Sequence, residues 1–112
     1  MIDASVITVS WNVKEHLEES LEALFKSDGV SYEVIVVDNN SDDSTQEFLL
    51  GESDKLTAIL NQNNRGFAAA NNQGISMAKG RYILLLNPDM KVHPDSLRLA
   101  VEWMDKNPQV GV

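Results

Sequence analysis

The chain has 112 residues, 43% of them hydrophobic, enough to form the core of one domain or of part of one. A formal net charge of −8 argues against nucleic-acid binding through a basic patch and against a polybasic membrane anchor within these residues. The absence of cysteine excludes disulfides, thiol nucleophiles and thiolate zinc sites, and no apolar run reaches the length of a transmembrane helix, so we expect a cytoplasmic protein with no membrane segment in this chain.

Apolar segments alternate with amphipathic ones along the chain. Strands are predicted at residues 2–9, 32–37, 56–60 and 81–86. The first helix is expected to begin after an Asn12 cap and to end at Ser27-Asp28-Gly29, with a buried face of Leu17, Leu21, Leu24 and Phe25. A shorter helix should run from the caps at residues 41–43 to about Leu50 and stop at Gly51.

Two further helices follow. The one at residues 66–79 carries the small residues Ala70 and Gly74 at helical spacing, which favours close packing on a sheet, and Gly80 is its expected stop. The last helix is expected to open at Pro94 or Asp95 and to end at Asn107-Pro108, burying Leu97, Ala100, Val101 and Met104, with Trp103 also in the core.

This alternation predicts an α/β fold, a mostly parallel sheet with helices on both faces in three layers. The short apolar run at residues 81–86 is typical of a strand buried on both faces. Residues 110–112 look like the start of another strand, so we expect the chain to be part of a larger protein. Such truncation would leave apolar surface and a strand edge exposed and would favour homodimers.

Polar residues follow each predicted strand. They are Ser10-Trp11-Asn12, the stretch 38–43, the stretch 61–66, and Asn87-Pro88-Asp89. Because the carboxyl ends of parallel strands meet at one edge, where open α/β sheets bind ligands, these residues predict a ligand site.

Two carboxylates stand out at this edge. Asp38 directly follows apolar strand residues, and it either accepts a hydrogen bond from a nucleotide base or ribose or caps a tight turn. Asp89 follows Pro88, whose ring fixes the backbone; alone it is a poor metal site, but with a diphosphate supplying further oxygens it would hold Mg²⁺. The alternative is an ordinary Asn-Pro-Asp turn.

The remaining candidates are fewer and less specific. Arg65 is the only basic residue in the stretch 61–72, where it has either a site role or a surface role. A bound diphosphate would be neutralised by metal, by the helix amino terminus at Gly66, or by both. Trp11 either stacks on a base or packs beside the first strand, and Asn87 is placed to meet a nucleotide's sugar. His16 and His93 are assigned to structure.

The ordered set of motifs resembles the amino-terminal half of a family 2 glycosyltransferase of the Rossmann-like GT-A fold. The matching pieces are Val6-Ile7-Thr8-Val9-Ser10-Trp11-Asn12, the stretch 34–45, Asn63-Asn64-Arg65-Gly66-Phe67-Ala68-Ala69-Ala70-Asn71, and the stretch 80–89. The resemblance implies a nucleotide-sugar site formed by Ser10, Trp11, Asn12, Asp38, Asn40, Arg65, Gly66 and Asn87. It places Asp89 as the Mg²⁺ or Mn²⁺ ligand, in the position of the family's Asp-x-Asp motif.

Asn87 departs from that motif, since it stands where the family has the first aspartate. Asn-Pro-Asp with Asn-Arg-Gly-Phe-Ala is similar to the rhamnosyltransferase-like branch, whose sugar donor is often dTDP-rhamnose, and a deoxyribose lacks the 2′-hydroxyl that an aspartate would bind. The resemblance implies inverting, metal-dependent transfer to an acceptor hydroxyl in cell-surface polysaccharide synthesis, at the inner face of the membrane. The general base would follow Val112, so residues 1–112 are expected to be a donor-binding part that is inactive alone.

Two other classes compete with this interpretation. A sugar nucleotidyltransferase would need a Gly-rich basic loop after the first strand, where Ser10-Trp11-Asn12 stands. A non-catalytic α/β metal-binding interaction module, like a receiver domain, would need paired acids at that position. The patterns of dinucleotide-binding, Walker A and nucleophile-elbow sites are missing from the sequence.

Overall fold

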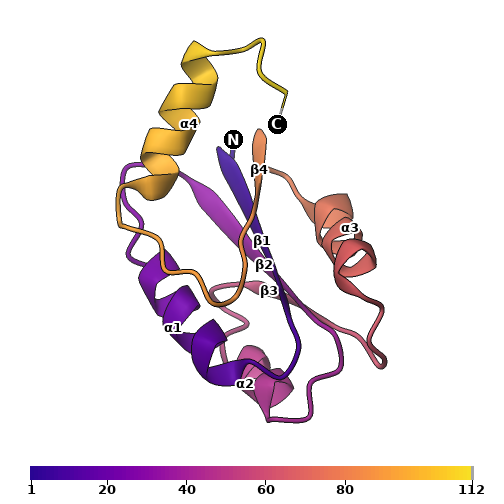
Figure 1. The fold of residues 1–112 in the computed structure, drawn as a ribbon. Coiled ribbons are helices and arrows are strands. Elements are labelled where there is room, and N and C mark those ends of the chain that lie inside the picture. The colour runs from indigo at the N-terminus through magenta and orange to yellow at the C-terminus, as the bar shows by residue number, and fades with distance from the viewer. Residues whose placement is uncertain (112) are drawn as a thin grey trace.

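The computed structural model describes residues 1–111, which form a four-stranded sheet with helices on both faces (Figure 1). The strands are β1 (Ala4–Ser10), β2 (Tyr32–Asp38), β3 (Thr57–Leu60) and β4 (Tyr82–Leu85). Their order is β3-β2-β1-β4, and every pairing is parallel. The helices are α1 (Lys14–Leu24), α2 (Thr45–Gly51), α3 (Phe67–Met77) and α4 (Ser96–Lys106). The predicted α/β class and element order are confirmed.

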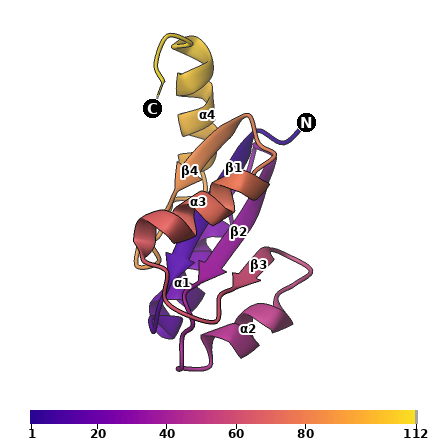
Figure 2. The ribbon, with the colours of Figure 1, turned by 90° about the vertical axis from the view of Figure 1, so that its right-hand side faces the viewer.

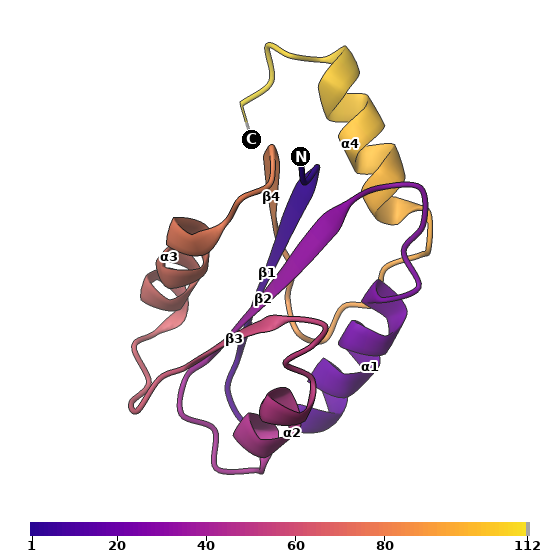
Figure 3. The same ribbon diagram turned by 180° about the vertical axis from the view of Figure 1, so that it is seen from behind.

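The side chains of the central strands alternate between two apolar clusters. Val6, Val34 and Val36 point to one face, where Leu17 and Leu21 of α1 cover them, together with Leu49 of α2 and Leu97 of α4. Ile7, Val9, Ile35 and Val37 point to the other face and pack against Ala70 of α3. Figures 2 and 3 show α3 alone on its side of the sheet, with α1 and α4 on the opposite side. Since β1 and β2 are covered on both faces, all residues of β1 and the last five of β2 are buried.

The small residues of α3 allow it to lie close to the sheet, as predicted. Ala70 is fully buried, and a Cβ added at Gly74 would lie 2.5 Å from Cγ2 of Ile7. No side chain larger than hydrogen fits at position 74 without moving the helix or Ile7.

The prediction that the fourth strand is buried on both faces is wrong for β4. Ile83 and Leu85 are 45% and 49% exposed, because β4 is an edge strand and α3 packs over β1 and β2 instead. On α4, Leu97 and Val101 are buried as predicted, whereas Ala100 and Trp103 are exposed and Met104 is half-buried. Residues 110 and 111 form no strand, and Val112 lies outside the described residues.

Several predicted helix ends are also corrected. Asn12 does not cap α1: its backbone is left-handed (φ 53°) and its Oδ1 accepts a hydrogen bond from the Asp42 amide, while Asp43 Oδ2 accepts from the Lys14 amide at 3.1 Å. Gly51 lies within α2 as its last residue. Gly80 does not end α3, which stops at Met77; it lies against β1, where a Cβ would sit 2.6 Å from the Ser5 nitrogen. At the start of α1, a contact with a distant loop therefore replaces the predicted local cap.

Within the described residues, every helix is too short or too polar to cross a lipid bilayer.

Candidate functional site

The carboxyl ends of the strands meet at one edge, as predicted. Ser10 at the end of β1 pairs with Asp38 at the end of β2, and Asp38 pairs with Leu60 at the end of β3. The Leu86 amide donates to the Ile7 carbonyl at 2.8 Å, which keeps the chain after β4 beside β1. The loops that follow all four strands consequently begin at this edge.

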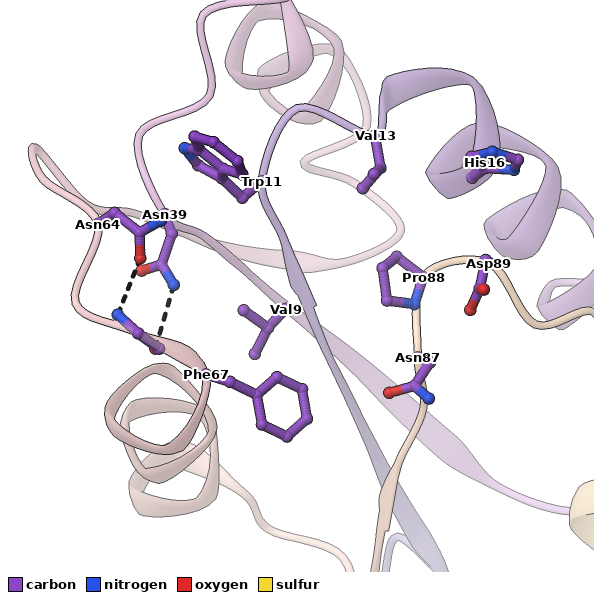
Figure 4. A pocket seen from close by; sticks show the side chains of 11 residues that line it. Val9, Trp11, Val13, His16, Asn39, Asn64, Phe67, Asn87, Pro88 and Asp89 are labelled. Atoms are coloured by element: carbon purple, nitrogen blue, oxygen red, sulfur yellow. Dashed lines mark hydrogen bonds between the residues drawn. The ribbon is translucent and has the colours of Figure 1, made fainter.

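A groove of about 710 Å³ opens between these loops (Figure 4). Residues from four parts of the chain line it: Val9, Trp11, Val13, His16, Asn39, Asn64, Gly66, Phe67, Asn87, Pro88 and Asp89. In Figure 4, Asn87, Pro88 and Asp89 lie on one side of Val9, and Asn39 and Asn64 lie on the other.

The structure brings four of the predicted site residues to this groove and leaves five outside its lining. Trp11, Gly66, Asn87 and Asp89 line it. Ser10 and Asp38 are buried at the ends of their strands, while Asn12, Asn40 and Arg65 are exposed and do not line the groove.

Asp38 is fully buried, and both of its carboxylate oxygens are engaged. Oδ1 accepts from the hydroxyls of Ser10 (2.7 Å) and Ser41 (2.6 Å). Oδ2 accepts from the Ser41 amide (2.8 Å) and from Gln46 Nε2 (2.9 Å). A carboxylate that accepts two hydrogen bonds on each oxygen has no acceptor site left. The N–H of a nucleotide base would therefore have to displace one of these partners. The turn-organising role of Asp38 is therefore visible, and its contact with a base stays a prediction.

Asn12 and Asn40 occupy left-handed backbone positions, with φ of 53° and 66°. Asparagine tolerates this conformation better than most residues, so both are explained by the turns they form. Arg65 presents its side chain to solvent, and its backbone amide donates to Asn39 Oδ1 at 3.4 Å.

The sequence interpretation missed several lining residues. His16, which was assigned to structure, lines the groove from the first turn of α1. A histidine in the first turn of a helix that begins at the carboxyl edge of the sheet was the available signal. Asn39 is only 2% exposed, and its Nδ2 donates to the Gly66 carbonyl at 3.1 Å. Nothing in the sequence predicts that Phe67 lines the groove, because the exposure of its side chain depends on where α3 begins.

The groove is suited to an anion that brings its own cation. No lysine or arginine among residues 1–111 lines it, and Asp89 is its one carboxylate. Gly66 and Phe67 lie where α3 begins, and the Ala70 amide makes the first bond within the helix, to the Gly66 carbonyl at 3.2 Å. The amides of the first turn point out of the helix end and carry partial positive charge, which favours a phosphate.

A metal ion in this groove would need oxygens that the described residues do not supply. The described residues contain no group of three or more His, Cys, Asp or Glu placed to hold an ion. Mg²⁺ commonly uses one or two carboxylates plus substrate phosphates. The exposed Asp89 carboxylate fits such a shared site and does not fit a metal held by protein alone.

Residues 5–112 match the model of the family described as glycosyl transferase family 2. The succinoglycan biosynthesis protein ExoO of Rhizobium meliloti is 34% identical over 104 residues, covering 92% of this chain and 30% of ExoO. The putative teichuronic acid biosynthesis glycosyltransferase TuaG of Bacillus subtilis is 30% identical over 103 residues, covering 89% of this chain and 41% of TuaG.

Solved structures agree with this match. S. aureus TarS (residues 1–349) in complex with UDP-GlcNAc superposes with a TM-score of 0.81 at 26% identity, covering 94% of this chain and 32% of that one. The mannosyltransferase PcManGT of Pyrobaculum calidifontis, in complex with GDP-Man and Mn²⁺, gives 0.83 at 28% identity, covering 90% and 32%. The chain thus spans about a third of the length of these proteins. It belongs to glycosyl transferase family 2.

Proposed function

We propose that this chain binds a nucleotide-diphosphate sugar in the groove and forms the sugar-donor-binding part of a glycosyltransferase. The observation that carries the proposal is that Asp89 and the amino terminus of α3 line the same groove at the carboxyl edge of the sheet. The complexes of TarS with UDP-GlcNAc and of PcManGT with GDP-Man and Mn²⁺ support it, since both proteins share this fold.

Asp89 would hold Mg²⁺ or Mn²⁺ together with diphosphate oxygens. The ion, when bound, neutralises the diphosphate and stabilises the charge of the departing nucleoside diphosphate. The first-turn amides of α3 would donate to phosphate oxygens, so the groove binds a dianion without a basic side chain. Trp11 and Phe67 are 53% and 58% exposed and offer apolar ring faces against which a base or sugar can pack.

The reaction that we assign to the whole protein is inverting sugar transfer. An acceptor hydroxyl would attack the anomeric carbon while the bond to the diphosphate breaks, and a base beyond Val112 would take the hydroxyl proton. We expect residues 1–112 to bind the sugar donor without transferring it. We propose dTDP-rhamnose as the sugar donor, because Asn87 replaces the aspartate that would bind a ribose 2′-hydroxyl. The proposed place of synthesis is the cytoplasmic face of a membrane.

We also propose that the chain associates with a second copy through its exposed apolar surface at β4. Ile83 and Leu85 support this, because a strand edge beside exposed apolar side chains favours pairing with another chain.

Calorimetric titration of UDP, GDP and dTDP, each with and without Mn²⁺, tests the function. We expect one nucleoside diphosphate to bind, and to bind more tightly with Mn²⁺. Metal binding that is indifferent to nucleotide would favour the non-catalytic metal-binding module instead. Measurable sugar transfer by residues 1–112 alone would contradict the division of roles between this part and the rest of the protein.

A further inference from the structure

A chain of side-chain amides lies behind the wall of the groove. Asn61, at the end of β3, donates from Nδ2 to Asn39 Oδ1 at 3.0 Å and to Gln73 Oε1 at 2.8 Å. Gln73, on α3, returns a bond from Nε2 to Asn61 Oδ1 at 2.9 Å. Asn39 and Asn61 are buried and Gln73 is half-buried. Of the three, only Asn39 lines the groove.

Backbone groups impose one orientation on each of these three side-chain amides. The Gly66 carbonyl can only accept, so it takes a hydrogen from Asn39 Nδ2, and the Arg65 N–H can only donate, so it faces Asn39 Oδ1. Asn61 must then turn Nδ2 towards Asn39, which leaves Asn61 Oδ1 to accept from Gln73. The middle of α3 is in this way connected back to the turn at its own start.

The turn before α3 has few other means of being held in place. Residues 62–69 are all exposed, so burial of apolar side chains does not hold them. Gly66 has a φ of 83°, which glycine adopts without steric cost, and its amide donates to Asn64 Oδ1 at 2.8 Å within the same turn. The Asn39 amide, which bonds to Arg65 on one side and Gly66 on the other, connects this turn to the residue after β2.

We propose that Gln73 is a positioning residue of the nucleotide-sugar site, acting through Asn61 and Asn39 on the Gly66 turn. This inference rests on the proposed function. When Gln73 is removed, Asn61 loses the donor to its Oδ1 and one of the two acceptors of its Nδ2, so that only the bond to Asn39 still restrains its side chain. Asn39 is then bonded to a less restrained partner. The first-turn amides of α3 then no longer meet a phosphate in one geometry, although Gln73 itself does not line the groove.

Gln73→Ala and Gln73→Glu test the proposal, with Asn72→Ala as the matched control, since Asn72 is exposed on the same helix. For the nucleoside diphosphate that binds the unmodified chain with Mn²⁺, Gln73→Ala should weaken binding by about 3- to 10-fold, the size of one net hydrogen bond. Asn72→Ala should leave binding unchanged.

The Gln73→Glu variant separates positioning from a general loss of stability. An ionised glutamate side chain at this position cannot donate to Asn61 Oδ1, whereas a protonated carboxyl can. The affinity of Gln73→Glu relative to the unmodified chain should therefore be low at pH 8 and recover as the pH falls towards the ordinary glutamate pKa of about 4.3, while the ratio for Gln73→Ala stays constant. Asp38 is linked to the network through Gln46, but the unmodified chain and the variants share it, so its effect cancels in the ratio.

Amide hydrogen exchange gives a readout that needs no ligand. The Arg65 amide should exchange faster in Gln73→Ala than in Asn72→Ala, because its acceptor, Asn39, is then held less firmly through Asn61. If Gln73→Ala binds the nucleotide as tightly as the unmodified chain and its Arg65 amide exchanges at the same rate, the positioning role of Gln73 is refuted. The proposed function would not be affected by that result. If the unmodified chain binds none of the three nucleoside diphosphates, the proposed function fails and the role of Gln73 in it fails with it.

Discussion

Asp89 offers the groove its one carboxylate among the described residues, so its charge should govern any metal dependence. We expect Asp89→Asn, which keeps the shape and removes the charge, to abolish the increase in nucleotide affinity that Mn²⁺ produces. Because even outer-shell partners of a metal contribute about tenfold to its affinity, loss of a ligand should cost at least that much. Calorimetry with and without Mn²⁺ measures the effect.

The control for this variant is Asp54→Asn, which removes an exposed charge outside the groove lining. It should preserve the Mn²⁺ effect. An undiminished Mn²⁺ effect in Asp89→Asn would show that the metal is held elsewhere.

Asp38 allows a test of the two roles that its position suggested. Asp38→Ala would leave the buried Ser10 hydroxyl and the half-buried Ser41 hydroxyl and amide without their acceptor, and Gln46 Nε2 with the Asn61 carbonyl alone, so we expect the free energy of unfolding to fall by about 2–4 kcal/mol. Urea unfolding measures this, with the exposed Asp42→Ala as control, expected to change it by less than about 0.5 kcal/mol. Full stability combined with lost nucleotide binding would instead favour direct contact with the base.

At the scale of elements, α3 can lie close to the sheet because position 74 is a glycine. Gly74→Ala would place a Cβ 2.5 Å from Ile7 Cγ2, so we expect overpacking to lower the free energy of unfolding by about 1–3 kcal/mol. Gly51→Ala is the control, since nothing lies within 4 Å of the Cβ it would gain. Thermal and urea unfolding of both variants check this, and equal stabilities would show that α3 shifts without cost.

Ion pairs, as well as the buried side chains of Leu97 and Val101, connect α4 to the sheet. Arg81 bonds Asp105 of α4 at 2.9 Å and Asp3 before β1 at 3.0 Å. Hydrogen bonds from Arg81, together with Ser31 for Asp3 and Tyr82 for Asp105, hold the pKa of both carboxyls below the ordinary 3.8. A carboxyl whose pKa is lower folded than unfolded stabilises the fold above its unfolded pKa and loses that contribution as pH falls through the folded value.

The unfolding temperature should therefore drop as pH is lowered from about 5 to below the ordinary 3.8 of Asp3 and Asp105. Arg81→Met should reduce the part of that drop due to this cluster. Thermal unfolding across the pH range measures it. Lys91→Met removes the ion pair with Glu19, which is more exposed than those of Arg81, so it should change the pH dependence less. A pH dependence that Arg81→Met leaves intact would exclude the cluster as its source.

At the scale of the molecule, the edge strand β4 carries exposed apolar side chains. Ile83 and Leu85 border a groove of about 670 Å³ between β4 and α4, whose other apolar lining includes Ile75, Leu97, Ala100 and Met104. We expect concentration-dependent self-association, and Ile83→Lys should weaken it by placing a charge at the edge. Sedimentation velocity measures it, with Leu50→Lys on α2 as control. A monomer at high concentration would contradict the proposal.

The sequence predicted every strand and helix in order because the apolar periodicity of each segment matches its structure. Leu17, Leu21 and Leu24 are buried where their helical spacing placed them. The errors fall where local signals compete with distant partners. Asn12 has the chemistry of a cap, but Asp43 takes that role from another loop, and the apolar Leu85 remains exposed for lack of a covering helix.

The candidate site divides in the same way. The alternation of strands and helices predicts parallel strands, so the residues after them share an edge, and that rule predicted the stretches that contain Asp89 and Gly66 as part of a ligand site. Whether a side chain faces the groove depends on loop conformation and on where the next helix begins. These placed Asn39 and His16, in the first turn of α1, in the lining and left Asn40 outside.

The sequence by itself determined the order of elements, the parallel sheet and the edge that carries the site, because these follow from the spacing of apolar residues along the chain. Only the tertiary structure decided that Asp38 is enclosed by Ser10, Ser41 and Gln46, and that Gln73 reaches the groove through Asn61. Hydrogen bonds between residues distant in sequence depend on how the loops pack against one another, and that packing leaves no periodic trace in the chain.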